Sequence, residues 1–146
     1  MSQPVDTRYQ LINPDTAEVL VPRLQLAATF WTRFRGLQFR RELPPDEGLL
    51  IAPCRSVHTH WMRFAIDVMM IDAEGTVLQV RHAVRPWRAC AGPRQTRAVL
   101  ELPAETAVLR EGDRVLIVAP NGDAVPKCVQ SLSRVINQNS QAAGFS

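Results

Sequence analysis

Alternation of apolar and polar residues is the recurrent pattern along this chain, and it predicts β-strands more often than helices. Side chains of a strand point alternately to its two faces, which gives a period of two. Turn sequences separate the alternating runs, as at residues 44–48, 72–75 and 111–113. We interpret seven runs as strands, at residues 19–26 (interrupted by Pro22), 48–52, 56–61, 66–71, 76–83, 97–102 and 114–118. Seven short strands predict a mainly β protein, built as a sandwich or a barrel.

The clearest local prediction is a β-hairpin over residues 66–80. An apolar run ends at Asp72, and Gly75 can supply the positive φ that the connecting loop needs. We expect this hairpin to be central to the sheet, with its aliphatic side chains, such as Val68, buried.

Helical spacing is convincing in one place, where Phe30, Phe34 and Leu37 share a face after Thr29 as N-cap. This predicts a short helix near residues 29–37. We therefore expect an N-terminal extension over residues 1–16, one β domain over residues 17–120, and a partly disordered tail over residues 121–146. Within the tail, Val129, Leu132 and Ile136 have the spacing of a helical turn or two against the body.

Composition supports a single folded domain. The chain has 146 residues, of which 46% are hydrophobic and 21% charged, as in ordinary globular proteins. No apolar run approaches the length of a membrane-spanning helix, and residues 1–16 lack the features of a secretion signal. The chain as given is therefore expected in the cytoplasm, where Cys54, Cys90 and Cys128 would be reduced.

The positive charge is carried by arginine, with sixteen arginines against the single Lys127. Eleven arginines and six acids lie between Arg33 and Arg97, which makes that segment the electropositive part. Trp31, Trp61 and Trp87 could add stacking surfaces for a nucleic acid. No recognised binding motif accompanies them, so nucleic-acid binding is not expected; a high-GC coding bias also explains the arginines.

Reactive side chains are densest between Cys54 and Asp67. On a strand, Ser56, His58 and His60 would share a face, and two histidines at i and i+2 are a usable start for a metal site. Candidates to complete it are Cys54, Asp67, His82 and Glu101, but the glutamate that follows the histidines in cupin-type sites is absent. We expect no bound metal and no cofactor.

Two carboxylates lie in apolar runs. Asp67 needs a partner when buried, and Arg63, His58 or backbone N–H groups are the candidates. We predict an Arg63–Asp67 ion pair, which requires a bend or bulge near residues 64–65. Glu101 is the natural second acid, unless it faces solvent on its strand. A catalytic triad of Ser56 or Cys54 with His58 and Asp67 lacks the supporting nucleophile elbow.

The order of several short motifs resembles an uncharacterised bacterial and archaeal family, domain of unknown function family 192, also called uncharacterised protein family 0127. The resemblance covers residues 24–118. It is carried by Arg35-Gly36-Leu37 with Leu43, Gly48-Leu49-Leu50, Ser56-Val57-His58-Thr59, Met62-Arg63, Ile66-Asp67-Val68, Asp72 with Gly75, Pro86-Trp87-Arg88, Leu100-Glu101-Leu102-Pro103 and Gly112-Asp113.

The resemblance implies a compact antiparallel β-sandwich or jelly-roll-like domain with a short helix, and it brings no activity. Three positions depart from the family pattern: His60 stands where glycine is usual, Ala65 where proline is frequent, and Glu105-Thr106 where a glycine commonly follows Leu-Pro-Ala. The first departure argues against a family-wide metal site of two histidines. Many relatives carry an export leader, so export of this protein is possible if its true start lies upstream.

These observations favour a small ligand-binding or accessory β domain over an enzyme. The expected polar or anionic ligand would lie in a pocket formed by Ser56, His58, Thr59, Arg63, Asp67 and Glu101, with Trp61, Trp87 and Met62 as apolar walls. Two alternatives stay open. One is a hydrolase or lyase that uses Asp67 or Glu101 as general base with His58, and the other is a structural protein-interaction module.

Overall fold

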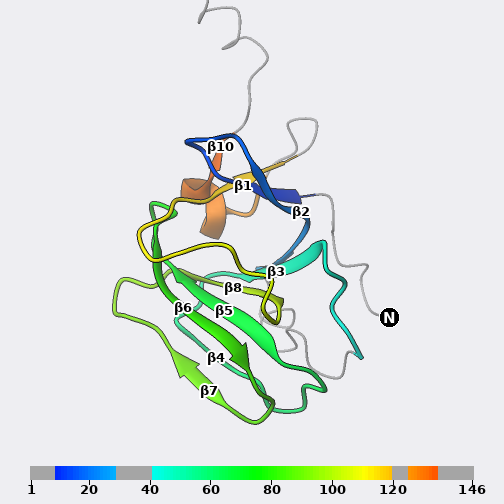
Figure 1. The fold of residues 1–146 in the computed structure, drawn as a ribbon. Helices are drawn as coiled ribbons and strands as arrows, with labels where there is room; N and C mark the ends of the chain where they lie inside the picture. The colour runs from blue at the N-terminus through cyan, green and yellow to red at the C-terminus, as the bar shows by residue number, and fades with distance from the viewer. Residues whose placement is uncertain (1–8, 29–40, 120–124, 135–146) are drawn as a thin grey trace, which may run out of the picture.

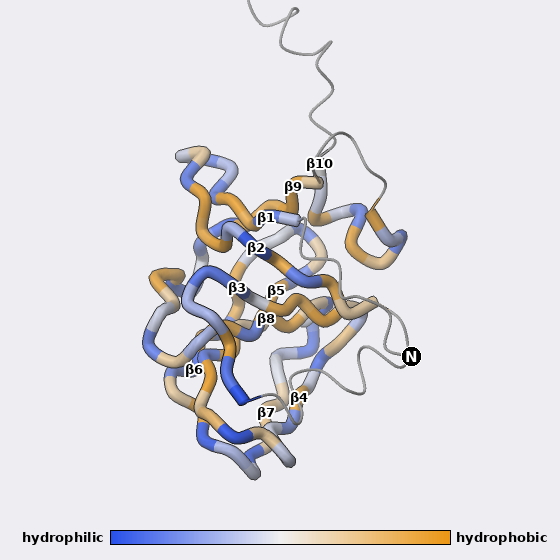
Figure 2. The backbone as a smooth tube through the Cα atoms, turned by 90° about the vertical axis from the view of Figure 1, so that its right-hand side faces the viewer, coloured by the Kyte–Doolittle hydropathy of each residue, from blue (hydrophilic) through white to orange (hydrophobic). Residues whose placement is uncertain are grey.

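The strands at the centre of the molecule are apolar on both faces. In the computed structural model, which describes residues 9–28, 41–119 and 125–134, every residue of β3 (Glu47–Ile51) and β5 (Ile66–Ile71) is buried. In β8 (Ala98–Pro103) only the last residue is partly exposed. Such strands require cover on both sides of the sheet. Figure 2 shows the hydrophobic runs of β5 and β8 at the centre of the molecule.

Eight strands form one mixed sheet in the order β10-β9-β1-β2-β3-β8-β5-β6 (Figure 1). The strands not yet given are β1 (Tyr9–Ile12), β2 (Val19–Ala27), β6 (Val77–Val84), β9 (Leu116–Val118) and β10 (Ser133–Arg134). A two-stranded sheet of β4 (Ser56–His58) and β7 (Ala89–Ala91) lies at the end of the molecule opposite β1 and β10.

The mainly β fold is confirmed, with two refinements. The pairs β2–β3 and β9–β10 are parallel, so the sheet is mixed where an antiparallel one was expected. The sheet is also open, with β10 and β6 at its edges. Both parallel pairs join strands that follow each other in the chain through a long connection instead of a hairpin turn. Alternation of side chains carries no information on strand direction.

Two apolar cores cover the two faces of the sheet. On β5, Met69 and Ile71 belong to the first core, and Ile66, Val68 and Met70 belong to the second. The first core also contains Val129 and Leu132 from the 3-10 helix η2 (Lys127–Leu132), while Val57 of β4 and Cys90 of β7 pack on the second. The small sheet therefore covers one face of the large one.

The predicted hairpin is present as β5 and β6, with Gly75 at a φ of 87°. Only β5 is central and fully buried, because β6 is an edge strand and most of its residues are partly exposed, so the expectation of a central hairpin was wrong for β6. Its tip is also tied to the segment before β9, because the Val115 N–H donates to the Gly75 carbonyl oxygen over 2.8 Å. A Cβ at position 75 would collide with the Val115 carbonyl oxygen. Gly75 is therefore required both by its turn and by this close approach.

The sheet extends beyond the segment that alternation assigned to the β domain. β1 lies within the expected N-terminal extension, and η2 and β10 lie within the expected tail. The buried residues of η2, Val129 and Leu132, have the three-residue spacing noted in the sequence. The helix predicted near residues 29–37 lies outside the described residues.

Candidate functional site

Asp67 is a fully buried carboxylate, and hydrogen bonds from backbone amides stabilise its charged form. Its Oδ1 accepts hydrogen bonds from the N–H groups of Ala83 at 2.8 Å and Glu105 at 2.9 Å, and Oδ2 accepts one from Ala107 at 2.9 Å. The Nδ1 of His82 lies 3.5 Å from Oδ2. Burial raises the pKa of the Asp67 carboxyl, but the three amides and the imidazole outweigh it and hold this pKa below its ordinary value.

This carboxylate, on β5, binds two other segments of the chain, namely β6 and the stretch after β8. Ala83, with φ of 50°, lies where the pairing of β5 and β6 shifts register, and Glu105, with φ of 63°, lies in the turn after β8. Both residues adopt left-handed backbone conformations that disfavour a side chain. The hydrogen bonds from their amides to Asp67 compensate for that cost, so Asp67 has a structural role.

The predicted Arg63–Asp67 ion pair was wrong. Arg63 is exposed, and among the described residues the one ionisable side chain within 4 Å of the Asp67 carboxylate is His82. The irregularity that the pair required is present on the other strand, at Ala83, and it brings backbone N–H groups to the carboxylate instead. Backbone amides were one of the three partners that the apolar run around Asp67 allowed.

Glu101 is buried on the opposite face of the sheet. The register places Glu101 between Leu49 of β3 and Val68 of β5, both in the second core. Its Oε2 has no hydrogen-bond partner, and burial alone raises the pKa of the Glu101 carboxyl to about 8. Because Asp67 pairs with Leu102 and points to the other face, the two acids do not share a pocket.

Thr59 is fully buried, and its hydrogen bonds connect the turn after β4 to the turn before β7. Its Oγ1 donates to the Arg85 carbonyl oxygen over 2.6 Å and accepts the Arg88 N–H over 2.8 Å. Its backbone N–H donates to the Arg88 carbonyl oxygen over 2.7 Å, and its carbonyl oxygen accepts the Trp87 N–H over 3.0 Å. The turn after β4 is therefore held rigidly against the turn before β7.

The end of β4 and these two turns place four rings in successive contact, here called the aromatic surface: His58, His60, Trp87 and Trp61. Ring centroids are 4.8 Å apart for His58 and His60, 5.3 Å for His60 and Trp87, and 4.8 Å for Trp61 and Trp87, which meet edge to face. Trp61 and Trp87 are 55% and 53% exposed. Exposed indoles in contact with each other are unusual on a small protein.

Both indoles stand on left-handed backbone, with φ of 64° at Trp61 and 64° at Trp87. Bulky residues rarely adopt this conformation, and it persists only where the surrounding structure enforces it. At Trp87 the sequence carries a signal, since Pro86 favours the second position of a turn whose next residue has positive φ. Trp61 has no comparable signal.

Arginines surround the aromatic surface. Arg63 follows the turn that holds Trp61, and Arg85 and Arg88 flank Trp87; all three are exposed. Four further exposed arginines lie between residues 54 and 97, namely Arg55, Arg81, Arg94 and Arg97. The acids of that segment are the buried Asp67 and, at the hairpin tip, Asp72 and Glu74. This part of the surface is therefore strongly positive.

The predicted pocket of six residues is not assembled. Ser56, His58 and Arg63 are exposed at one end of the molecule. Thr59 is buried, and its hydrogen-bonding groups are occupied by the two turns. Asp67 and Glu101 are buried on opposite faces of the sheet. Met62, expected as a pocket wall, is buried in the second core. What sequence reasoning did find is the pair of tryptophans with His58 and Arg63.

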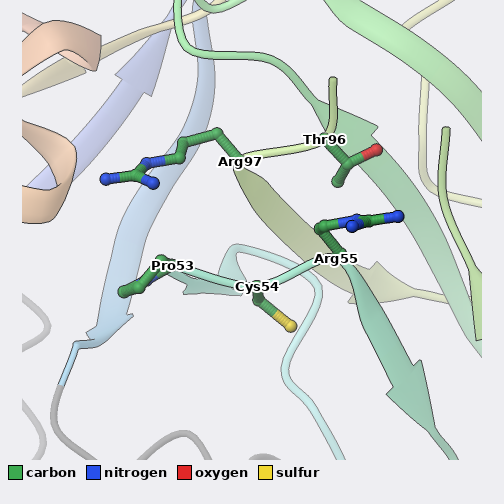
Figure 3. Close-up of a pocket in the computed structure, with 5 residues that line it drawn as sticks. All are labelled: Pro53, Cys54, Arg55, Thr96 and Arg97. Atoms are coloured by element: carbon green, nitrogen blue, oxygen red, sulfur yellow. The ribbon is translucent and has the colours of Figure 1, made fainter. Parts of the chain in front are cut away.

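A shallow hollow of about 290 Å³ lies nearby, lined by Pro53, Cys54, Arg55, Thr96 and Arg97. Figure 3 shows the side chains of Arg55 and Arg97 extended in opposite directions. The Cys54 thiol donates to the Ser56 carbonyl oxygen over 3.0 Å. These groups do not converge on one point, as a small-ligand site requires.

The described residues contain no group of three or more His, Cys, Asp or Glu side chains placed to hold a metal ion. Within the same part of the chain, Cys54, Cys90 and Cys128 form no disulfide with one another. No helix among the described residues is long and apolar enough to cross a membrane.

Comparison with known proteins decides the family. The family model DUF192, described as uncharacterized ACR, matches residues 11–117. The chain belongs to the DUF192 family. A UPF0127 protein of Thermococcus sibiricus is 29% identical over 141 residues, which cover 89% of each chain.

Two solved structures share the fold of this chain. A protein of unknown function from Novosphingobium aromaticivorans is 22% identical, with a TM-score of 0.63 over 73% of this chain and 81% of its own. A proposed transcription regulator from Sinorhizobium meliloti is 23% identical, with a TM-score of 0.64 over 73% of this chain and 89% of its own. At these identities the likeness concerns the fold.

Proposed function

We propose that this DUF192 protein is a binding domain that recognises an anionic ligand with a planar or ring-shaped group. The aromatic surface carries the proposal: two exposed indoles in mutual contact, fixed on left-handed backbone, with Arg63, Arg85 and Arg88 beside them. Ser56 and Arg55 lie on or beside β4 at the same end and could add polar contacts.

The chemistry of the surface fits such a ligand. An indole face offers a large rigid area for stacking, with little conformational entropy to lose. A guanidinium is always charged, and its planar fork suits carboxylate and phosphate groups. Because Thr59 already fixes both turns, the surface is organised before binding, which lowers the cost of ordering.

Catalysis is less well supported. A general base must reach a substrate proton, whereas Asp67 uses both oxygens on backbone amides and Glu101 is buried without access to solvent. His58 contacts His60 and has no carboxylate to orient it in the described part of the chain. The hydrolase or lyase alternative therefore has no assembled site.

Tryptophan fluorescence tests the proposal. In a Trp31→Phe background, the signal comes from Trp61 and Trp87. Adenosine monophosphate and glucuronate, which combine a ring with an anionic group, should change this emission saturably. Inorganic phosphate and adenosine, each with one feature only, should have weaker effects.

An Arg85→Gln, Arg88→Gln double variant supplies the charge control, and Arg110→Gln supplies a matched change of an exposed arginine elsewhere. The double variant should weaken the response about tenfold, from two lost charged contacts of roughly 0.7 kcal/mol each. Equal responses of the double variant and Arg110→Gln would contradict the proposal.

A further inference from the structure

From the aromatic surface we infer that the ligand is a single-stranded nucleic acid, an inference that rests on the proposed function. Four rings are in successive contact, with centroid distances of 4.8, 5.3 and 4.8 Å. A ligand that covers the exposed parts of these rings gains most by presenting several planar groups. Consecutive bases of a single strand do so, and their faces are open to stacking.

The arginines match the other half of such a polymer. Arg63 follows the turn that holds Trp61, and Arg85 and Arg88 flank Trp87, so exposed guanidinium groups and rings come from the same two segments. A nucleic-acid strand likewise carries planar bases and anionic phosphates together. Arginine serves both partners, since it pairs with phosphate and stacks on bases.

The composition of the surface favours a nucleic acid over a protein partner. A stable protein interface has an apolar core of aliphatic and aromatic side chains. Among the described residues, the exposed large hydrophobic side chains are Trp61, Trp87, Val19 and Val108, so the aromatic surface has no exposed large aliphatic residue within it. Planar rings bordered by guanidinium groups are better suited to bases and phosphates.

Single strands are favoured over duplexes for a geometric reason. In a duplex the base faces are stacked on one another, so an exposed indole cannot reach them without disrupting the helix. The ribbon beside the aromatic surface, formed by β4 and β7, has three residues in each strand and packs on the second core, so it is too short to follow a groove. Recognition would therefore be tolerant of sequence, through stacking and charge.

Fluorescence anisotropy on the full chain tests the inference. The probes are a labelled single strand of about 12 nucleotides, its duplex, and a labelled heparin fragment of similar charge. The single strand should bind at least about tenfold more tightly than the duplex or the heparin fragment. With three phosphates contacted, log K should fall with log salt at a slope of about −2.

Variants separate stacking from charge. Trp87→Leu keeps an apolar side chain without a π face and should lose about tenfold or more in affinity, whereas Trp87→Phe should lose less. Arg88→Gln should lower the salt slope by about 0.7, and Arg110→Gln should leave affinity and slope unchanged. Thermal unfolding of each variant shows that its fold is intact.

Equal affinity for the duplex or the heparin fragment, or full binding by Trp87→Leu, would overturn the inference. An oligonucleotide that binds no more tightly than adenosine monophosphate would also overturn the inference. In that case a saturable response to adenosine monophosphate would still support the proposed function. If neither probe gives a response, both the inference and the proposed function are contradicted.

Discussion

At the scale of single residues, the two buried acids of the sheet behave in opposite ways. Asp67 is buried with backbone amide donors on both oxygens, and Glu101 is buried with no partner for Oε2. Burial penalises the charged form of both, but amides stabilise the carboxylate of Asp67 alone. Their effects on stability therefore run in opposite directions with pH.

Asp67→Asn should lower the free energy of unfolding by about 3 kcal/mol at pH 7, because the Asn NH₂ group would face an N–H donor. The folded pKa of Asp67 lies below 3.8, so its contribution is present above that pH and is lost as the pH falls through the folded value. Urea denaturation at pH 7 and pH 3 should show the gap between variant and parent narrowing in acid.

His82→Ala is the control for this prediction. The imidazole lies 3.5 Å from Asp67, and the His82 side chain is 55% exposed, so its removal should cost under about 1 kcal/mol. A loss as large as that of Asp67→Asn would mean that the imidazole, not the amides, stabilises the carboxylate.

Glu101→Gln should become more stabilising relative to the parent as the pH rises. The unfolded chain releases the Glu101 proton near 4.5, whereas the folded protein keeps it until about 8, so the parent loses stability between these values. The loss is about 1.4 kcal/mol per pH unit within that window. Chemical denaturation from pH 5 to pH 8 measures it, with the exposed Glu111→Gln as reference; parallel curves for all three proteins would refute the assignment.

At the scale of elements, turns with left-handed residues fix how strands meet. Gly75 and Gly112 have φ of 87° and 91°, but a Cβ at Gly75 meets the Val115 carbonyl oxygen, whereas a Cβ at Gly112 meets nothing within 4 Å. Both glycines have a left-handed backbone, but only Gly75 lies in close contact with another segment. Comparing the two positions therefore separates the cost of the backbone conformation from the cost of the steric contact.

Gly112→Ala should therefore cost about 1 kcal/mol, from the left-handed conformation alone. Gly75→Ala should cost about 3 kcal/mol or more, because the tip of the hairpin must also move away from the segment before β9. Thermal and urea unfolding of the two variants check the difference. Equal costs would show that the hairpin tip yields freely.

At the scale of the whole molecule, stability depends on segments far apart in sequence that share the first core. Leu11 of β1, Ile117 of β9 and Leu132 of η2 are all fully or almost fully buried there. The ends of the described chain thus close the same core, and a defect in either should be felt globally.

Leu132→Ala should lower the free energy of global unfolding by about 2–5 kcal/mol through the cavity that it leaves. Gln130→Ala, an exposed position on the same helix, should be close to neutral. Urea denaturation in the Trp31→Phe background, followed by the fluorescence of Trp61 and Trp87 at the opposite end of the molecule, is the measurement. An unchanged midpoint for Leu132→Ala would show that η2 detaches without unfolding the domain.

The sequence predicted the parts of this fold that repeat over many residues. Alternation located most strands, and the apolar run with Gly75 located the hairpin. Strand direction and the β2–β3 pairing were missed, because parallel contacts between distant segments leave no local signal. β1 was missed because four residues are too few for a period to be visible.

The sequence predicted several residues of the candidate site, but it did not predict how these residues are arranged. His58, Arg63, Trp61 and Trp87 do share one end of the molecule, but Asp67 and Glu101 point to opposite faces because they pair with different neighbours in the β5–β8 register. Register depends on the whole sheet, so it could not be read from either strand alone.

The bonds of Thr59 also determine how the aromatic surface opens. The amides of Trp87, Arg88 and Thr59 are all engaged within this one cluster, although the indoles and guanidinium groups outside it are exposed. These amides should therefore exchange with deuterium slowly and at a common rate, since none can be released unless the two turns separate. A protein surface so constrained would meet its ligand as a rigid body and would show its motion only in rare, cooperative openings.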